Sequence, residues 1–424
     1  MGLGKTLQTI AFLSTQKNKN SLIVVPTSLI YNWKDEFKKF APRIKIGMAY
    51  GETEERRKII NDYKKYDIII TTYGILKNDL DYFNDKLFDF CIIDEAQNIK
   101  NSKSQNSLTV KSIKAKNKFA LTGTPIENNL KELWSIFDFI MPGFLYSEDE
   151  FVSKFNRSDN ESLKLLRALI NPFILRRTKE DVAGDLPNKS EKIVLVDLEK
   201  DQKLIYDSYI KNIKDKIKDE SNMQVFSYLT RLRQICLHPA LVFDDYIGSS
   251  GKTSAAVSLI EKQLKKNGKV LVFSQFTSFL KIFGDELDKN NIKYYSLTGA
   301  TQSKTRIKLV NDFNDSSDVK VFLISLKAGG TGLNLTSANL VIHFDPWWNP
   351  AVESQASDRA HRIGQKQEVE VIKLISKNTI EEKIISLQED KKELIESVMS
   401  CDDISNTVIN KKVIDELINS YLDS

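Results

Sequence analysis

Short apolar runs separated by stretches with helical patterning recur along the chain, and they constrain its fold more than any other feature. The runs lie at Leu22–Val25, Ile68–Ile70, Phe90–Ile93, Phe119–Leu121, Val270–Phe273, Val321–Ile324, Leu340–Ile342 and Val369–Ile375. Runs of this kind are typical of strands buried on both faces. Strands that alternate with helices form parallel, doubly wound sheets through right-handed crossovers. The sequence therefore predicts an α/β fold whose ligands collect at the carboxyl ends of the strands.

The strand rhythm divides the chain into regions. It largely stops between Ser147 and Ser250, where charged stretches such as Glu199–Glu220 favour helix. After Thr379, apolar residues at helical spacing indicate an amphipathic helix that packs back on the preceding fold. We expect a first lobe at 1–145, a helical insertion and linker at 146–249, a second lobe at 250–385 and a C-terminal helical brace at 386–424.

Length and composition narrow the range of possible functions but do not identify one. The 424 residues can build two or three cores, and the charge of +5 permits a polyanionic partner without requiring one. Three scattered cysteines and three histidines offer neither a disulfide framework nor a zinc pattern. No apolar run reaches the roughly 18 residues that a membrane helix needs. We expect a cytoplasmic, nucleoid-associated protein that has no membrane contact and works as a monomer.

The first residues carry the pattern of a phosphate-binding loop. In Gly2-Leu3-Gly4-Lys5-Thr6, the glycines let backbone N–H groups surround phosphate oxygens, Lys5 reaches the outer phosphates and Thr6 can ligate magnesium. The implied cofactors are ATP and Mg²⁺. Two other interpretations stand beside this one: the same residues match an N-myristoylation signal, and Gly-Lys-Thr can arise by chance. A second copy at Gly251–Thr253 follows no apolar strand, and we interpret it as an interdomain turn.

A second motif supports the phosphate loop. The apolar run Phe90–Ile93 ends in Asp94 and Glu95, where one carboxylate suits magnesium and the other can orient and deprotonate the attacking water. Such a pair is also common as a plain helix N-cap, and taken alone the two interpretations are evenly balanced. The pairing with a phosphate loop favours the catalytic one. Hydroxyl groups at Leu121–Pro125 follow the next predicted strand.

The second half contributes two arginines. If residues 354–365 are helical, Gln355, Arg359 and Arg362 share one face, beside a small apolar stripe that packs the helix. The arginines could then stabilise charge on the transferring phosphoryl group. For an arbitrary helix, a solvated basic face is the commoner explanation.

Several blocks in fixed order resemble the Swi/Snf family of superfamily-two helicases. They include Gly-Leu-Gly-Lys-Thr, Val-Val-Pro-Thr-Ser-Leu-Ile-Tyr-Asn-Trp, Asp-Glu-Ala-Gln-Asn-Ile-Lys-Asn, Leu-Thr-Gly-Thr-Pro-Ile-Glu-Asn-Asn, Ala-Gly-Gly-Thr-Gly-Leu-Asn-Leu, Asp-Pro-Trp-Trp-Asn-Pro and Asp-Arg-Ala-His-Arg-Ile-Gly-Gln. The resemblance extends from Gly2 to about Val398. It implies two RecA-like lobes that bind MgATP between them and use hydrolysis to move along a DNA duplex.

The resemblance also assigns roles to single residues. It assigns phosphate binding to Gly4, Lys5 and Thr6. Asp94 and Glu95 serve magnesium and water. Arg359 and Arg362, with Gln355, complete the site. Gln97 stands where many members have His, so its expected coupling of the ATP site to DNA is a variant of the helicase pattern. The DNA segments are Pro26, Thr27 and Ser28, then Thr71, Thr72 and Tyr73, and in the second lobe Ser274, Gln275, Ser325, Lys327 and Gly329. Backbone contacts of this kind are sequence-independent and salt-sensitive.

These observations predict an ATP-dependent translocase on double-stranded DNA that displaces a protein bound there. One alternative is an RNA or single-strand helicase of the same superfamily. The other is a catalytically silent fragment that binds DNA or complements a separate N-terminal piece. It arises because the resemblance places a strand, an acidic pair and a Gln-containing adenine segment before Met1. We therefore expect weak or absent ATPase activity for the chain by itself.

Overall fold

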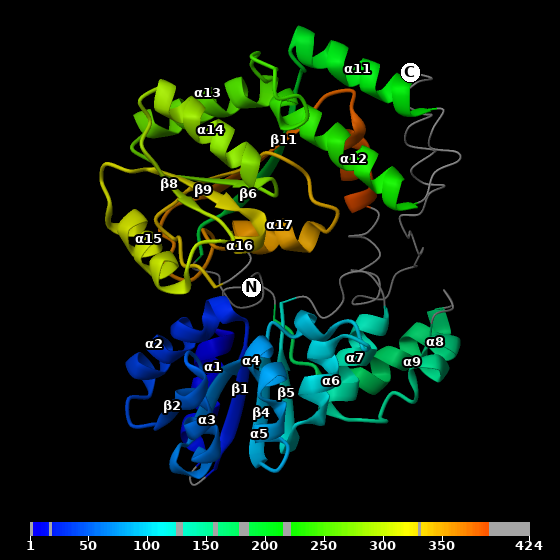
Figure 1. The fold of residues 1–424 in the computed structure, drawn as a ribbon, viewed down its shortest axis with the longest axis vertical. Coiled ribbons are helices and arrows are strands. Elements are labelled where there is room, and N and C mark those ends of the chain that lie inside the picture. The colour runs from blue at the N-terminus through cyan, green and yellow to red at the C-terminus, as the bar shows by residue number, and fades with distance from the viewer. Residues whose placement is uncertain are drawn as a thin grey trace. The chain divides into compact units, whose positions relative to one another are not determined.

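The structure is a computed structural model, and it describes residues 3–16, 19–123, 130–155, 160–177, 186–214, 222–329 and 332–389. The chain forms two compact units that divide between Arg177 and Thr178. Each has its own parallel sheet (Figure 1). Gly2, Thr124, Pro125, Gly330, Leu394 and most of the predicted C-terminal brace lie outside the described residues.

The first unit is built on a five-stranded sheet. Its order is β2-β3-β1-β4-β5, with every described pairing parallel. The strands are β1 (Ser21–Val25), β2 (Ile46–Met48), β3 (Ile68–Thr72), β4 (Leu87–Asp94) and β5 (Lys114–Leu121). Successive residues of β1 alternate between two core clusters, since Leu22 and Val24 pack in one and Ile23 and Val25 in the other. The sheet is therefore covered on both faces, as its apolar runs predict.

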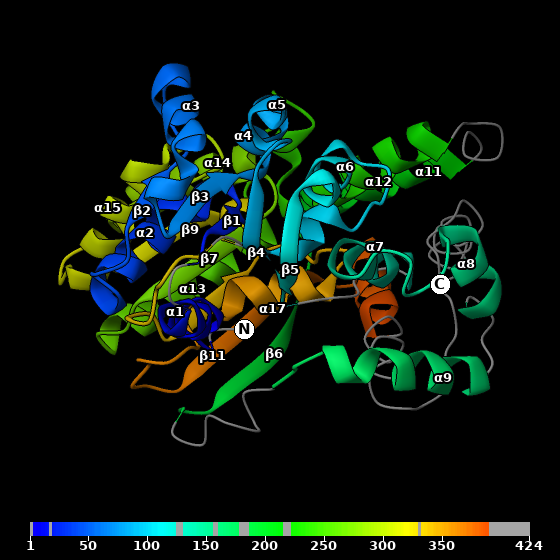
Figure 2. The same cartoon turned by 90° about the horizontal axis from the view of Figure 1, so that it is seen from below.

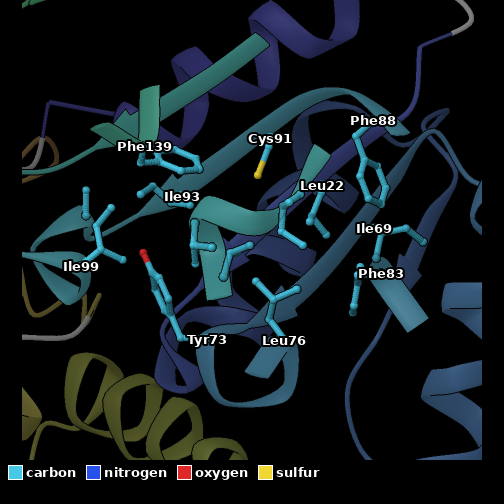
Figure 3. Packing of buried hydrophobic residues seen from close by; sticks show 14 of the residues in the cluster. Leu22, Ile69, Tyr73, Leu76, Phe83, Phe88, Cys91, Ile93, Ile99 and Phe139 are labelled. Atoms are coloured by element: carbon cyan, nitrogen blue, oxygen red, sulfur yellow. The ribbon is translucent and has the colours of Figure 1, made fainter. Parts of the chain in front are cut away.

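Different helices cover the two faces of this sheet. The cluster of Ile23 receives residues of α1 (Lys5–Thr15) and α2 (Ile30–Phe40). The cluster of Leu22, drawn in Figure 3, receives residues of α3 (Thr53–Asn61), α4 (Tyr73–Asn78), α5 (Leu80–Phe83), α6 (Gln105–Ser112) and α7 (Leu130–Ile140). A separate cluster joins α7 to α8 (Glu148–Phe155) and α9 (Asn160–Ile170). Single turns of 3₁₀ helix lie at η1 (Thr27–Leu29), η2 (Tyr63–Lys65), η3 (Ala96–Ile99) and η4 (Asn171–Phe173).

The second unit has a six-stranded sheet in the order β6-β11-β10-β7-β9-β8, again with parallel pairings. The strands are β6 (Lys189–Val196), β7 (Val270–Ser274), β8 (Tyr294–Leu297), β9 (Val321–Ser325), β10 (Leu340–His343) and β11 (Val369–Ser376). In Figure 2, β6 and β11 run side by side. The region that we predict from the sequence to lack strands therefore contains a strand, β6.

Helices surround this second sheet as well. They are α11 (Lys200–Lys214), α12 (Asn222–Leu237), α13 (Gly251–Lys265), α14 (Thr277–Lys289), α15 (Ser303–Asp315), α16 (Leu326–Gly329), α17 (Pro350–Ser357) and η5 (Pro239–Leu241). A further helix covers residues 380–389, where Ile380 and Ile384 are buried against α11 and α12. The predicted helix after Thr379 is thus present, and within the described residues it packs on the second unit.

The second Gly-Lys-Thr copy begins helix α13, so the interpretation as an interdomain turn was wrong. Gly251 lies so close to the backbone of Asp197 that a Cβ would meet its carbonyl oxygen at 2.1 Å. The ammonium group of Lys252 is buried in an ion pair with Glu381 and donates to the carbonyl oxygen of Phe344 at 2.6 Å. At this copy, Gly251 therefore permits a close approach of two backbone segments, and Lys252 forms a buried ion pair.

Candidate active site

The predicted phosphate loop leads directly into α1. Gly4 adopts a left-handed conformation with φ 75°, which glycine reaches without the penalty a Cβ imposes. The helix begins at Lys5 with no side chain capping its start and no acidic residue in the first turn. The first N–H groups of a helix lack intrahelical partners and attract anions. Among the described residues of the loop, this arrangement suits phosphate.

Asp94 closes β4 at the carboxyl edge of the first sheet. Its Oδ2 accepts a hydrogen bond from the indole Nε1 of Trp33 at 2.9 Å, and its Oδ1 accepts one from the backbone N–H of Glu95 at 2.9 Å. Burial and the neighbouring Glu95 raise the pKa of the Asp94 carboxyl, whereas the charge of Lys5 and the Trp33 bond lower it. Lys5 and Asp94 thus lie near enough for their charges to interact. A buried carboxylate beside another carboxylate favours a cation.

Glu95 is held in an unusual backbone conformation next to Asp94. It has φ 49° and is 8% exposed. The side-chain amide nitrogen of Gln97 donates to its Oε2 at 2.9 Å, and the amide oxygen of Gln97 accepts a bond from the Thr122 hydroxyl at 3.0 Å. A non-glycine residue with positive φ is sparsely populated and is often found at functional sites. Gln97 therefore connects the Glu95 carboxylate to the end of the neighbouring strand β5.

The two DNA segments predicted in the first unit differ in exposure. Thr27 is exposed in η1 and its neighbours Pro26 and Ser28 are half-buried. By contrast, Thr71, Thr72 and Tyr73 are buried. The Thr71 hydroxyl donates to the carbonyl oxygen of Ala49, the Thr72 hydroxyl caps α4, and the Tyr73 hydroxyl donates to the carbonyl oxygen of Asp94 at 2.8 Å. These three side chains are therefore engaged inside the unit.

The predicted DNA segments of the second unit lie at the carboxyl ends of β7 and β9. Ser274 is buried and its hydroxyl donates to Asp345 Oδ1 at 2.6 Å, while Gln275 is half-buried. Ser325 is buried at the end of β9, and Lys327 is exposed on the short helix α16, which ends at Gly329. Lys327 is thus the cation of this group that faces solvent.

The predicted helix over residues 354–365 was wrong in its second half, because α17 ends at Ser357. Arg359 and Arg362 lie in the turns that follow, and Ile363 beside them is 64% exposed instead of packed. Bonds to other loops replace those of a continued helix: the Arg359 carbonyl oxygen accepts from the N–H of Leu335, and the Gln365 amide donates to Ala338 and Ala360.

Both arginines nevertheless donate to backbone carbonyl oxygens. Arg359 Nε donates to the carbonyl oxygen of Gly329 at 3.1 Å, and Arg362 Nη1 donates to that of Leu333 at 3.2 Å. Arg359 is 7% exposed and Arg362 is half-buried. Gln355, on α17, is also half-buried. Because α17 ends before both of them, the two arginines do not share a helical face.

Sequence reasoning gave no role to two residues that hold these segments. Trp33 stands in the block Ile-Tyr-Asn-Trp and contacts Asp94, and Asp345 stands in Asp-Pro-Trp-Trp and contacts Ser274. Asp345 also pairs with the buried guanidinium of Arg233 at 3.6 Å. A buried Trp normally places its N–H on an acceptor, and this is the signal that could have identified Trp33.

The profile of the SNF2-related domain matches residues 1–241, more than half of the chain, and that of the helicase conserved C-terminal domain matches residues 251–364. The chain belongs to the SNF2-related family. It is 40% identical over 411 residues to an "Uncharacterized ATP-dependent helicase" of Mycoplasma pneumoniae, covering 94% of this chain and 39% of the relative. To the mouse "SWI/SNF-related matrix-associated actin-dependent regulator of chromatin subfamily A member 1" it is 36% identical over 445 residues, covering 99% of this chain and 42% of the relative.

A solved structure of the same family is the Sulfolobus solfataricus SWI2/SNF2 ATPase core in complex with double-stranded DNA. It is 40% identical, with 95% of this chain and 88% of that chain covered and a TM-score of 0.45. The SNF2-related chain spans about two fifths of the length of the two curated relatives named above. Within the part of the chain that the structure describes, no helix is long and apolar enough to cross a membrane. Nor do the described residues contain a cluster of three or more His, Cys, Asp or Glu side chains suited to a metal.

Proposed function

We propose that the SNF2-related chain is the motor of an ATP-dependent translocase on double-stranded DNA. The observation that carries the proposal is the arrangement in the first unit: α1 starts uncapped directly after the left-handed Gly4, and the buried Asp94 carboxylate at the end of β4 is held by Trp33 and by the N–H of Glu95. Family membership supports the same reaction, because the relatives include proteins named as helicases and chromatin regulators.

Nucleotide binding falls to the first residues of the chain. We assign the phosphates to Gly2, Gly4, Lys5 and Thr6, of which Gly2 lies outside the described residues. Backbone N–H groups at the α1 start and the Lys5 ammonium group would hold the phosphate oxygens. The amide groups of a helix start recognise phosphate through charge and geometry, so this part of the site would serve ATP and ADP alike.

The first unit also suits magnesium. The Asp94 carboxyl is buried and its pKa is raised by burial and by Glu95, so a nearby cation would stabilise its ionised form. Magnesium bound to a nucleotide commonly uses one or two protein oxygens together with phosphates and water, which is consistent with the absence of a larger carboxylate cluster among the described residues. We assign Asp94 and the Thr6 hydroxyl to it. When bound, the ion would neutralise charge on the phosphate oxygens.

Hydrolysis requires a base and charge stabilisation. Glu95 would orient and deprotonate the attacking water, with Gln97 holding its carboxylate through the 2.9 Å bond. We propose that Arg359 and Arg362 stabilise the charge on the transferring phosphoryl group, with Gln355 contributing to the same group of polar side chains. Both guanidinium groups donate to backbone carbonyl oxygens, that of Arg359 to Gly329 at the end of α16 and that of Arg362 to Leu333.

DNA would contact the loops at the strand ends. Thr27 and Lys327 are exposed, and they suit direct contacts to phosphate oxygens; Pro26, Ser28 and Gln275 lie beside them or at a corresponding strand end. The buried Thr71, Thr72, Tyr73, Ser274 and Ser325 would support those loops, with Gly329 contributing backbone. Contacts to phosphates carry no base sequence and weaken as salt rises. We therefore infer sequence-independent binding, and a protein bound to the DNA as the target of the motor.

ATP hydrolysis measured with duplex DNA, single-stranded DNA, RNA and no nucleic acid tests the proposal. We expect the highest rate with duplex DNA, even where the rate of the chain by itself is low, and no rate above background under any condition would favour the catalytically silent fragment. Lys5→Ala and Glu95→Gln should each lower that rate on the order of 100-fold or more, since each removes a group acting on the transferred phosphate. Lys19→Ala is the matched control, because Lys19 is an exposed lysine of the same unit that pairs with Asp89. Equal rates for Lys5→Ala and the wild type would contradict the assignment, and preference for single strands or RNA would favour a helicase of another substrate class.

A further inference from the structure

Two aromatic side chains reach Asp94 from the two faces of the first sheet. Trp33 belongs to the core cluster that contains α1 and α2, whereas Tyr73 belongs to the opposite cluster with Leu76 and Ile93. Figure 3 shows Tyr73 in that second cluster, with its hydroxyl directed toward the side of Ile93 and Ile99. One donates to the Asp94 carboxylate and the other to its carbonyl oxygen. Asp94 is therefore held through both its side chain and its backbone.

Both aromatic residues lie close in sequence to a predicted DNA segment: Trp33 comes shortly after Pro26–Ser28, and Tyr73 is the last residue of Thr71–Tyr73. Trp33 lies in the first turn of α2, which starts directly after η1 (Thr27–Leu29). Tyr73 is the first residue of α4 and follows Thr71 and Thr72 without a gap. Rigid secondary-structure elements and hydrogen bonds are among the contacts that carry coupling between two sites. A shift of either segment would therefore act on the bond to Asp94.

The bonds are buried, so they cannot be exchanged freely for bonds to water. Trp33 is 1% exposed and Tyr73 is 5% exposed. The Trp33 ring packs against Phe37 with centroids 6.1 Å apart. Breaking a buried hydrogen bond leaves its partner unsatisfied, which costs more than breaking an exposed one. The bonded and unbonded arrangements of each donor therefore differ clearly in energy, so the bond is either made or lost.

The same contacts fix the peptide group between Asp94 and Glu95. Its carbonyl oxygen accepts from Tyr73, and its N–H donates to Asp94 Oδ1. Glu95 is thereby held at φ 49°, a conformation that surrounding contacts must maintain. Changes at Trp33 or Tyr73 thus alter the carboxylate assigned to magnesium and the orientation of the carboxylate assigned to water.

We propose that Trp33 and Tyr73 are positioning residues that couple the first unit's two DNA segments to Asp94, so that DNA binding and magnesium-nucleotide binding strengthen each other. This inference rests on the function proposed above. Coupling between two ligands is reciprocal: if DNA raises nucleotide affinity by a given factor, nucleotide raises DNA affinity by the same factor. The indole and phenol donors would be the physical link.

Fluorescent ADP, titrated at several Mg²⁺ concentrations with and without duplex DNA, measures this coupling without turnover. For the wild type we expect DNA to tighten binding by on the order of 5-fold or more. Trp33→Phe and Tyr73→Phe should each reduce the ratio to below about 2-fold and raise the Mg²⁺ concentration needed for half-maximal binding. For Trp33→Phe, DNA affinity without nucleotide, followed by anisotropy, should stay at the wild-type value, because Trp33 is not among the residues assigned to DNA.

Two matched variants control for packing. Trp134→Phe removes another buried indole, which donates to the Tyr146 carbonyl oxygen at 3.2 Å and packs in the separate cluster of α7, α8 and α9. Tyr63→Phe removes a hydroxyl from a ring that packs on the same core as Tyr73. Both should retain the wild-type coupling ratio, and all four variants are checked for folding by circular dichroism and thermal unfolding.

The outcomes separate the inference from the proposed function. Folded Trp33→Phe and Tyr73→Phe variants with the wild-type coupling ratio would overturn the inference while leaving the motor proposal intact. Equal loss in Trp134→Phe would also overturn it, because packing alone would then account for the effect. If the wild type and Lys5→Ala bound nucleotide equally, the proposed function would be wrong, and the inference that rests on it would be wrong as well.

Discussion

At the scale of single residues, the roles that follow from chemical type were predictable and the roles that follow from position were not. Lys5 after two glycines and Asp94 after an apolar run stand in sequence patterns that by themselves suggest phosphate and magnesium. Trp33 has no such pattern, because its importance depends on where α2 crosses the end of β4. Likewise, no spacing in the sequence reveals that the Tyr73 hydroxyl turns inward to Asp94.

His343 provides a pH-dependent test at the same scale. It is buried, its Nε2 lies 2.8 Å from the Ser357 hydroxyl, and burial lowers its pKa from 6.5 to about 4. The unfolded chain therefore binds an extra proton between these values, so the stability of the second unit is full above pH 6.5 and falls as pH drops toward 4. The loss from this residue should reach about 3 kcal/mol.

The measurement compares urea unfolding of the wild type and His343→Gln between about pH 7.5 and 4. Because glutamine does not titrate, the difference in unfolding free energy between the two proteins should change across this range and level off below the lower pKa. Other titrating groups contribute equally to the unfolding free energies of both proteins, so their contributions cancel in the difference. Parallel curves for the two proteins would show that His343 titrates alike in the folded and unfolded states.

At the scale of elements, apolar periodicity predicted every interior strand of the described sheets but only one of their four edge strands, β5. All eight predicted runs lie in parallel strands. The three missed strands, β2, β6 and β8, each form the edge of a sheet. An edge strand buries less surface: β6 is largely exposed, its first half, Lys189–Lys192, is polar, and Ile193 and Leu195 in its short apolar half are 48% and 53% exposed. The helix after Ser354 failed for another reason, since side-chain bonds to distant loops replace its second half.

The start of α13 yields a prediction about the second Gly-Lys-Thr copy. Lys252→Met should destabilise the second unit by about 3–5 kcal/mol, because it leaves the buried Glu381 carboxylate without its cation. Fluorescent-ADP affinity should be unchanged, since Lys252 is not part of the proposed nucleotide site. Lys5→Ala should show the reverse, with lost nucleotide affinity and unchanged stability.

A double variant identifies the cause of the destabilisation. Lys252→Met with Glu381→Gln removes both charges and keeps an acceptor for the Ser376 N–H, which bonds to Glu381 Oε2 at 2.8 Å. We expect it to recover much of the lost stability in urea titrations. If Lys252→Met instead abolished nucleotide binding in a stably folded protein, this copy would have to be reassigned as a phosphate loop.

At the scale of the whole molecule, the chain has two units with separate cores. The compact units divide between Arg177 and Thr178, inside the segment 146–249 that the sequence marks as an insertion. Helices α7, α8 and α9 share one cluster in the first unit, whereas β6 pairs with β11 in the second. Local patterns could not divide this segment, because membership of a unit depends on contacts between residues far apart in sequence. The predicted boundaries at 145 and 249 remain predictions.

Separate cores predict separate unfolding, and one matched pair of substitutions tests this. Phe88 lies fully buried in the core beneath the first sheet, and Phe283 lies fully buried in the second unit against Phe279 and Phe344. Replacing either by Ala leaves a cavity and should cost its own unit about 3–5 kcal/mol. Calorimetry of the wild type should resolve two transitions, of which Phe88→Ala lowers one and Phe283→Ala lowers the other. If both variants lowered a single common transition, the two units would unfold together, and the division of the chain would be a matter of shape and not of stability.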